Sequence, residues 1–415
     1  MAIKSDSILL VLPVAFKKGD NGELCLEKQA CNGIDRWADN FARVTVACPV
    51  IDESRFQSDT TIEHVPASDL QHLDRVELVE LPASHRIRDY IQSRKLLARL
   101  IDENRYLCFA IGGLLGDWAS LAATQAIRLR RPYAVWTDRV EHQVVRNSYQ
   151  DRHGLRRIYR FLRDRLLQSW LMAIAERHVI SRAELGLFHG MDCFAAYRHW
   201  CREPHLVHNI HLKESDRISP QALQEKMRQI MAGRALRISY AGRVAAMKGP
   251  LDWIETMGQL ESMGIDFSAS WLGDGPLLEQ ARQQLKTRGL DDRVSFPGHQ
   301  GEKDRLLQSF RQADLFVFCH QTPESPRCLI EAMLSGTPIV GYDSPYPEDL
   351  LQEFSTRLLT ARNDTAALAS TLQRLDSHRD ELARAVEHCH RISEHYTDQA
   401  VFSHRSRLIK AHLPA

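Results

Sequence analysis

The feature that most restricts the fold of this chain is a repeated alternation of short β-branched runs with longer amphipathic stretches. Such alternation is typical of parallel sheets whose strands are joined by crossover helices. The alternation pauses over a polar stretch at about 209–220 and then restarts, which predicts two α/β domains. We expect strands at 8–12, 43–47, 76–81, 107–111, 133–136, 178–181 and 205–207, and then at 237–240, 267–272, 293–296, 315–318 and 338–341.

The expected architecture is two facing, doubly wound, Rossmann-like domains. Residues 1–209 form the first domain and residues 210–385 the second, while the helical segment 386–415 packs back on the first domain. Ligands of such sheets bind at the carboxyl ends of the strands, so we expect the active site in the cleft between the domains.

Composition narrows the class of protein. The 415 residues include 54 Lys and Arg against 53 Asp and Glu, which argues against a nucleic-acid binder. No apolar run approaches the roughly 20 residues of a membrane span, and Asp6 interrupts what would be the basic start of a signal peptide. Nine cysteines without a CxxC pair indicate reduced thiols and a cytoplasmic protein.

One region departs from this neutral average. Residues 86–165 hold 17 Arg and Lys against 8 Asp and Glu. Leu155, Ile158 and Leu162 recur there at helical spacing, with arginines off that stripe. The pattern fits a core-facing helix with a solvated arginine face. It also fits a basic patch for an anionic membrane or a pyrophosphate-bearing acceptor.

The motif SYAGRVAAMKG places Arg243 and Lys248 in a loop that leaves a strand, ahead of a helix expected at 250–262. Two cations there suit a leaving diphosphate, whose negative charge grows as its bond to carbon breaks. Taken alone, the motif also fits two surface charges at a turn. The motif SWLGDGPLLEQ predicts a turn at Gly273 with Pro276 opening the next helix, and the backbone amides of that turn could hold a ligand or only shape it.

The most specific stretch is PESPRCLIEAMLSGTPIV. Ser325 reads as an N-cap and Pro326 as the first residue of a helix that ends near Gly336. The amides at that helix start favour an anion. Glu324 precedes the helix and Glu331 lies inside it among apolar residues, where a carboxylate needs a partner. Two ribose hydroxyls would serve, and so would a group of the protein itself.

The order AGRxxxxKG, LGDGP, VSFPGH, ADLFVF and EAMxSGTPIVG resembles the retaining glycosyltransferases of family 4, which have the GT-B fold. The resemblance covers about residues 236–350, and it implies that residues 210–385 bind the nucleotide sugar while residues 1–209 form the acceptor-side domain. It implies transfer of a sugar from a nucleotide-diphosphate sugar with retention, without a cofactor or a bound metal. It also implies that Arg243 and Lys248 hold the diphosphate, Glu331 the ribose, Glu324 the donor sugar, and the backbone near Gly298 and His299 the base.

The chain departs from that family in two places. Six residues separate Glu324 from Glu331 where the family has seven, so either the loop is shorter or Pro323 takes the place of the first glutamate. In the first domain, Asp138 ends a strand where the family often presents a histidine. We assign Asp138 to catalysis, with a helix cap as the alternative. Gly22, after the first strand, is expected to line the donor or acceptor side.

The predicted function is therefore transfer of a sugar to a glycan or lipid-linked acceptor, in surface polysaccharide or lipopolysaccharide biosynthesis. The protein would work in the cytoplasm or at the inner face of the membrane. Two alternatives remain open. One is a GT-B epimerase or phosphorylase, and the other is a non-catalytic partner that has kept the nucleotide-sugar pocket.

Overall fold

The chain divides into two compact units, Met1–His211 with Asp398–Ala415, and Leu212–Thr397. The structure is a computed structural model, which describes residues 6–19, 22–52, 63–83, 87–112, 117–143, 168–322 and 324–414. The first unit ends at His211, where 209 was expected. The border expected at 385/386 falls inside helix α15 (Arg379–Ile392), and the chain returns to the first unit only at Asp398.

A mixed sheet forms the centre of the first unit, in the order β10-β9-β8-β7-β1-β4-β2-β3-β5, with β6 also paired to β4. All five residues of β1 are buried, as expected of a central parallel strand. The strands are β1 (Ser7–Val11), β2 (Phe16–Lys18), β3 (Leu24–Glu27), β4 (Arg43–Asp52), β5 (His64–Pro66), β6 (Val76–Pro82), β7 (Tyr106–Ala110), β8 (Ala134–Thr137), β9 (Leu185–His189) and β10 (Pro204–Val207).

Strands β2, β3 and β5 extend this sheet beyond the parallel core that the sequence predicts. β3 runs antiparallel to both β2 and β5. These strands are only three or four residues long and half-buried, so they carry little hydrophobic pattern. Gly22 lies in the turn between β2 and β3 with φ +82°, and its amide donates to the Gly19 carbonyl at 2.9 Å. Gly22 therefore helps to form this turn. Its predicted place on the donor or acceptor side stays a prediction.

The helices of the first unit are α1 (Lys28–Ala38), α2 (Ile87–Glu103), α3 (Trp118–Arg128), α6 (Ser169–Ile180), α7 (Gly190–Tyr197) and α16 (Asp398–His412). The strand expected at 178–181 is wrong, because these residues are the end of α6 and the turn after it. The strand of this region is β9, at Leu185–His189. Val179 and Ile180 face the core from the helix end, which explains the misleading apolar run.

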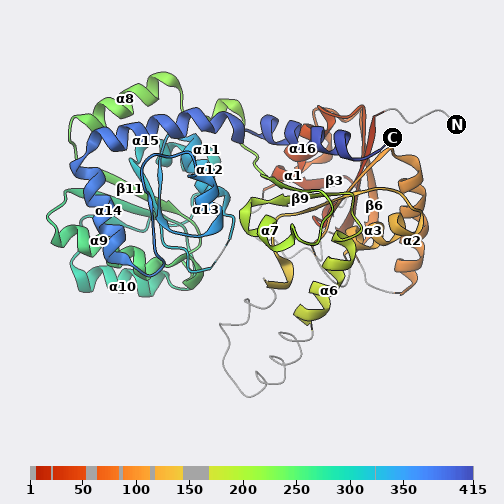
Figure 1. Cartoon of the computed structure of the whole chain (residues 1–415), viewed down its shortest axis with the longest axis horizontal. Coiled ribbons are helices and arrows are strands. Elements are labelled where there is room, and N and C mark those ends of the chain that lie inside the picture. The colour runs from red at the N-terminus through yellow and green to blue at the C-terminus, as the bar shows by residue number, and fades with distance from the viewer. Residues whose placement is uncertain are drawn as a thin grey trace, which may run out of the picture. The chain divides into compact units, whose positions relative to one another are not determined.

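Helix α16 is the last element of the chain and packs on the first unit, beside α1 (Figure 1). The Trp37 ring of α1 meets the Phe402 ring of α16 edge-on, with centroids 5.5 Å apart. Asn32 of α1 donates to Asp398, the first residue of α16, at 3.1 Å. These contacts join segments that are far apart in the sequence.

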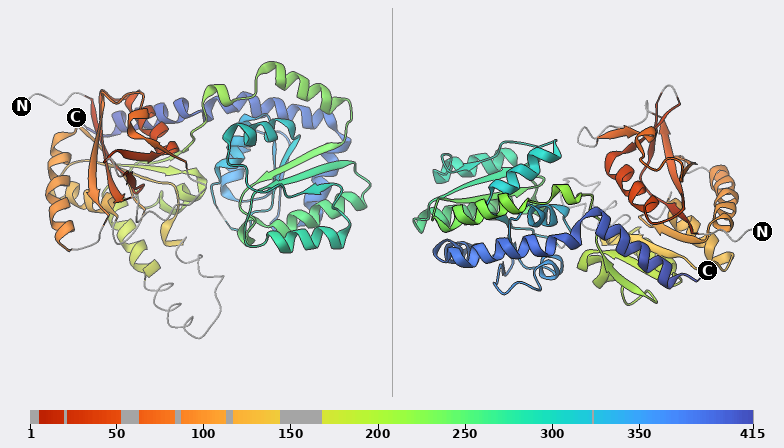
Figure 2. Two further views of the ribbon diagram at one scale, coloured as in Figure 1. Left: turned by 180° about the vertical axis from the view of Figure 1, so that it is seen from behind. Right: turned by 90° about the horizontal axis from the view of Figure 1, so that it is seen from above.

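The second unit holds a parallel sheet in the order β13-β12-β11-β14-β15-β16. Helices α8 and α15 pack together on one side, and α9 and α10 pack together on the other (Figures 1 and 2). The strands are β11 (Leu236–Ala241), β12 (Phe267–Leu272), β13 (Val294–Ser295), β14 (Leu315–Phe318), β15 (Ile339–Tyr342) and β16 (Leu359–Thr360). The helices are α8 (Pro220–Met231), α9 (Pro250–Ser262), α10 (Leu278–Arg288), α11 (Lys303–Gln312), α12 (Arg327–Leu334), α13 (Pro345–Leu350), α14 (Thr365–Ser377) and α15.

Helix α9 has the predicted bounds, and its start shows why. Pro250 is its first residue, and Gly249 before it has φ +65°. A Cβ on Gly249 would lie 2.1 Å from the Cys319 carbonyl oxygen, so only glycine fits there. Helix α10 instead begins at Leu278, two residues after Pro276, which was expected to open it. No helix in the described part of the chain is both long and apolar enough to cross a bilayer.

Candidate active site

Four loops of the second unit hold most of the predicted site residues. They follow β11, β12, β13 and β14, which are mutually parallel neighbours in the sheet. Since the carboxyl ends of parallel strands lie at one edge, the four loops leave the sheet at the same edge. The motifs recognised separately in the sequence thus belong to one place in the fold.

The loops after β11 and β12 lie directly against each other. A Cβ on Gly273 would come within 2.1 Å of the Gly242 carbonyl oxygen, which is fixed backbone. The Val244 amide donates to the Asp274 carbonyl at 2.9 Å, and the Leu277 amide donates back to Val244 at 3.0 Å. Gly273 is therefore needed for loop packing, which is independent of any contact it makes with a ligand.

Gly298 and His299, predicted near the base, are tied to the same turn. The His299 amide donates to the Asp274 carboxylate at 2.9 Å. Gly298 has φ +88°, a conformation that glycine adopts without strain. The His299 side chain itself is exposed. The loop after β13 is thus anchored by the turn that contains Gly273.

Arg243 and Lys248 differ in their surroundings. Arg243 is exposed, and its side chain makes no hydrogen bond or ion pair with the described residues. Lys248 donates from Nζ to Glu324 Oε1 at 2.6 Å, and the two side chains are only 13% and 20% exposed. The structure thus places Lys248, predicted to bind the diphosphate, against Glu324, predicted to bind the donor sugar. The side chain of Arg243, the second predicted diphosphate cation, is left accessible.

Two buried side chains that the sequence reading missed continue this contact. His320 Nδ1 lies 3.7 Å from Glu324 Oε1, and His320 Nε2 is 2.8 Å from the Tyr240 hydroxyl. Burial, together with the nearby Lys248 charge, holds the pKa of His320 well below its usual range, so the ring is neutral. Tyr240 and His320 lie within or beside the recognised motifs, and this proximity was the one available signal for them.

The prediction that Ser325 caps a helix is wrong. Helix α12 begins at Arg327, with Pro326 before it at ψ 127°, and no side chain makes a cap hydrogen bond. Pro326 is extended and not helical, so the helix starts later than expected. Ser325 Oγ is buried and has no hydrogen-bond partner among the described residues. Pro323, the alternative first glutamate position, lies outside the described residues.

Glu331 lies inside α12 and is partly buried. Burial raises the pKa of its carboxyl, and the charges of Arg327 and Lys303 oppose that rise. The carboxylate makes no hydrogen bond with the described residues. The alternative partner for Glu331, a group of the protein itself, is therefore not seen, because no described residue donates a hydrogen bond to this carboxylate.

Asp138 follows β8 in the first unit. Its Oδ1 accepts from Trp136 Nε1 at 2.7 Å, and its Oδ2 accepts from Asn209 Nδ2 at 2.6 Å. Each oxygen therefore has a side-chain donor that fixes its position. His142, four residues after Asp138, forms a hydrogen bond through Nδ1 with the Glu176 carboxylate at 2.6 Å.

Arg405 is a buried cation that stacks on the Trp136 ring and lies in none of the sequence motifs. The guanidinium carbon of Arg405, on α16, is 3.9 Å from the centroid of the Trp136 ring. Arg405 is fully buried, and none of its three guanidinium nitrogens has a hydrogen-bond partner among the described residues. Burial lowers the pKa of Arg405 to about 10, and the nearby Cys108 and Asp138 oppose that shift. Asp138 thus has a buried positive charge for a neighbour.

The basic window can be followed only in part. Residues 144–165, with the expected Leu155–Ile158–Leu162 stripe, lie outside the described residues. Beyond them, α6 opens with an exposed apolar face made of Trp170, Leu171 and Ile174, at 61%, 39% and 47% exposure. An exposed apolar face therefore follows the basic window along the chain.

Residues 219–395 match the family Glycosyl transferases group 1. The 2-deoxystreptamine glucosyltransferase of Streptomyces kanamyceticus is 29% identical over 138 residues, which are 33% of this chain and 35% of that protein. The putative colanic acid biosynthesis glycosyltransferase WcaL of Escherichia coli K12 is 31% identical over 178 residues, 40% of this chain and 43% of that protein. These matches span less than half of either relative.

Solved structures extend the likeness to the whole chain. The Anabaena protein HepE in complex with UDP superposes with a TM-score of 0.65 at 16% identity, covering 98% of this chain and 99% of HepE. A likeness at this identity concerns the fold. The fold is GT-B, with two Rossmann-like domains, as the sequence predicts.

Proposed function

We propose that this protein is a retaining glycosyltransferase of family 4, because residues 219–395 match the Glycosyl transferases group 1 family and the fold is GT-B. It moves a sugar from a nucleotide-diphosphate sugar to a glycan or lipid-linked sugar acceptor. The observation that carries this proposal is the Lys248–Glu324 contact, together with the Arg243 side chain on the same loop, which pairs with no described residue.

In this mechanism the two cations receive the leaving diphosphate. Arg243 approaches from the exposed side of the loop, and Lys248 shares its charge between the diphosphate and Glu324. As the glycosidic bond to the donor breaks, negative charge grows on the diphosphate, and prepositioned cations stabilise that charge. Glu324, held at 2.6 Å by Lys248, is then positioned to bind the hydroxyls of the donor sugar.

Glu331 is assigned to the ribose. Its carboxylate has no hydrogen-bond donor among the described residues, and burial raises its pKa, so the ionised form gains from two hydroxyl donors. The base would bind along the backbone of Gly298 and His299, and the unpartnered Ser325 hydroxyl would face the donor. No cofactor or metal takes part in the proposed transfer.

Asp138 is the proposed contribution of the first unit. Hydrogen bonds from Trp136 to one oxygen and from Asn209 to the other fix its orientation. A carboxylate there stabilises positive charge that develops on the donor carbon, or accepts the proton of the acceptor hydroxyl. Replacing Asp138 by Asn keeps the shape and removes the charge, so unchanged transfer by that variant would remove Asp138 from the mechanism.

The biological setting proposed is surface polysaccharide or lipopolysaccharide biosynthesis, in the cytoplasm or at the inner face of the membrane. The name of WcaL, a putative colanic acid enzyme, supports this setting. The exposed apolar face of α6 and the arginine-rich window 86–165 suit contact with an anionic membrane.

A non-catalytic nucleotide-sugar-binding protein is the second candidate. It is favoured by the shortened spacing from Glu324 to Glu331 and by the Lys248–Glu324 pair, in which each charge neutralises the other. A GT-B epimerase or phosphorylase would share the donor site, and product analysis with and without acceptor separates it from a transferase.

The test is a calorimetric titration of the full chain with UDP, GDP and ADP. We expect one nucleotide to bind clearly better than the others, and Glu331→Gln to weaken that binding. Glu348→Gln, an exposed change on α13, is the matched control. Absence of binding by all three nucleotides at millimolar concentration would overturn the proposal. Binding without turnover across sugar donors and acceptors would favour the non-catalytic candidate.

A further inference from the structure

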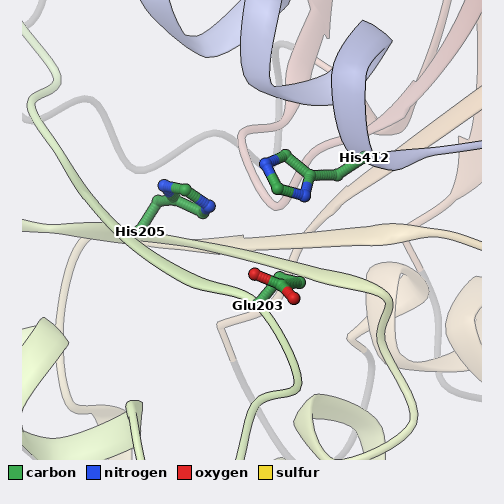
Figure 3. A group of neighbouring side chains, drawn as sticks. All are labelled: Glu203, His205 and His412. Atoms are coloured by element: carbon green, nitrogen blue, oxygen red, sulfur yellow. The ribbon is translucent and has the colours of Figure 1, made fainter.

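A cluster of three metal-ligand side chains lies in the first unit, apart from the residues assigned to transfer. Glu203 directly precedes β10, His205 lies on β10, and His412 is the last residue of α16. Figure 3 shows the carboxylate and the two rings gathered between the strand and the helix end. One potential ligand atom from each residue lies within 4.8 Å of the other two.

The local structure explains how these side chains meet. Residues two apart in a strand point to the same face, which puts Glu203 and His205 on one side of the chain. The rings of His205 and His412 approach to a centroid distance of 4.9 Å, at an interplanar angle of 56°. The cluster therefore joins β10 to α16, which are far apart in the sequence and belong to the same unit.

None of the three side chains makes a hydrogen bond with the described residues. His205 Nε2 is buried and has no hydrogen-bond partner in the part of the chain that the structure describes, although buried polar atoms are normally paired.

We propose that Glu203, His205 and His412 bind one Zn²⁺ ion and so fasten the end of α16 to strand β10. Two imidazoles and a carboxylate are ligands that Zn²⁺ accepts, at roughly 2.0–2.2 Å, whereas Mg²⁺ and Ca²⁺ favour all-oxygen sites. Small side-chain rotations bring the three atoms from their present spacing to a shared ion. Because Glu203 is exposed, water completes the tetrahedron.

This site goes beyond the proposed transfer function and does not depend on it. Its effect would be structural, since α16 also carries the buried Arg405 that stacks on Trp136. An ion at His412 would hold the end of that helix. Binding of an ion to the folded state alone raises thermal stability as its concentration rises.

The experiment titrates the full chain, freed of metal with a chelator, with Zn²⁺ by calorimetry. Co²⁺, followed by its visible absorption, reports the ligand geometry. We expect Glu203→Gln to bind one Zn²⁺ ion fewer than the wild type, or to bind that ion more than tenfold more weakly. His412→Ala should show the same loss. Glu203→Gln is exposed and keeps the fold, so loss of binding in this variant reports the site itself.

The matched controls are Glu394→Gln and His395→Ala, which alter an exposed neighbouring pair with a 3.7 Å contact. Both should bind Zn²⁺ like wild type. Zn²⁺ should raise the melting temperature of the wild type and of the controls more than that of Glu203→Gln. The proposal is overturned if Glu203→Gln and His412→Ala match the wild type in stoichiometry and affinity, or if the controls lose binding equally.

Discussion

The two units hold their predicted site residues in different ways. In the second unit, Lys248 and Glu324 come from loops at one edge of one sheet, and they contact each other directly. In the first unit, Asp138 depends on Asn209, near the end of the domain, and lies near Arg405 on the last helix. A site built from strand-end loops can thus be read from local motifs, while a site completed by the chain terminus cannot.

Each unit contains a buried cation, and the two cations differ in hydrogen bonding and in pKa. Lys226 in the second unit donates to Thr337 Oγ1 at 2.7 Å, and burial lowers its pKa to about 7. Arg405 in the first unit has no hydrogen-bond partner among the described residues, and it keeps its charge because its pKa stays near 10. Lys226 can lose its proton when burial is costly, but a guanidinium at neutral pH cannot.

The largest expected effect tests the local site of the second unit. Lys248→Met removes one diphosphate cation and leaves Glu324 without its 2.6 Å partner. We expect the transfer rate to fall by about 10²–10³-fold, the usual loss when a prepositioned electrostatic group is removed. Steady-state kinetics with the donor identified by titration would measure it. Lys286→Met, an exposed change on α10, should leave the rate unchanged.

A smaller loss for Lys248→Met, within a few-fold of wild type, would contradict the assignment. It would show that Arg243 alone holds the diphosphate. In that event the contact between Lys248 and Glu324 would be a structural ion pair.

The next effect concerns the Lys226 charge and pH. The unfolded chain has a lysine pKa near 10.5, against about 7 when folded. Between these values the unfolded state binds the extra proton, so the contribution of Lys226 to the free energy of unfolding rises with pH, by ~4 kcal/mol at most. Lys226→Met should lose that rise in denaturant titrations from pH 7 to 10, while Lys286→Met should keep it. Equal pH slopes in Lys226→Met and wild type would refute the shifted titration.

Gly273→Ala tests whether the packed loops need their glycine. Its Cβ would lie 2.1 Å from the Gly242 carbonyl oxygen, so the two loops must separate. We expect a loss of about 1–3 kcal/mol in the free energy of unfolding, with weaker nucleotide binding. Gly301→Ala meets its nearest atom, in the His299 ring, at 3.9 Å and should change neither quantity. Wild-type stability in Gly273→Ala would show that the loops are not rigidly packed.

The sequence predicts much of the fold because strand runs are local. β12 and β14 have the predicted bounds, and α9 does too, since Pro250 and Gly249 mark its start. The strand at 178–181 was misplaced because an amphipathic helix that ends in Val179–Ile180 has the same short apolar run. β9 was missed because Gly186 interrupts its pattern; a Cβ there would lie 2.5 Å from the Phe188 ring.

The candidate site divides in the same way. Arg243, Lys248 and Glu331 could be proposed because each lies in a motif whose residues are close in sequence. The cap at Ser325 failed because Pro326 is extended and not helical, a choice of backbone that the motif does not reveal. Arg405 could not be proposed, because its partners become visible only when α16 packs on the first unit.

Arg405 provides the smallest expected effect and the sharpest test of the contrast between the units. A buried charge without hydrogen bonds destabilises a fold, so Arg405→Met, which keeps an apolar contact with Trp136, should raise the free energy of unfolding by about 1 kcal/mol. The same change removes the guanidinium stacked on Trp136, whose Nε1 donates to Asp138, and should lower the transfer rate by roughly tenfold because the Asp138 carboxylate is held less firmly. Denaturant titration and kinetics measure the two effects, with the exposed Arg407→Met as control.

A more stable, slower enzyme means that Arg405 on the last helix supports Asp138 at the expense of stability. A destabilised enzyme with unchanged rate would mean that Arg405 only holds α16 in place, and the first unit would then differ from the second in packing alone.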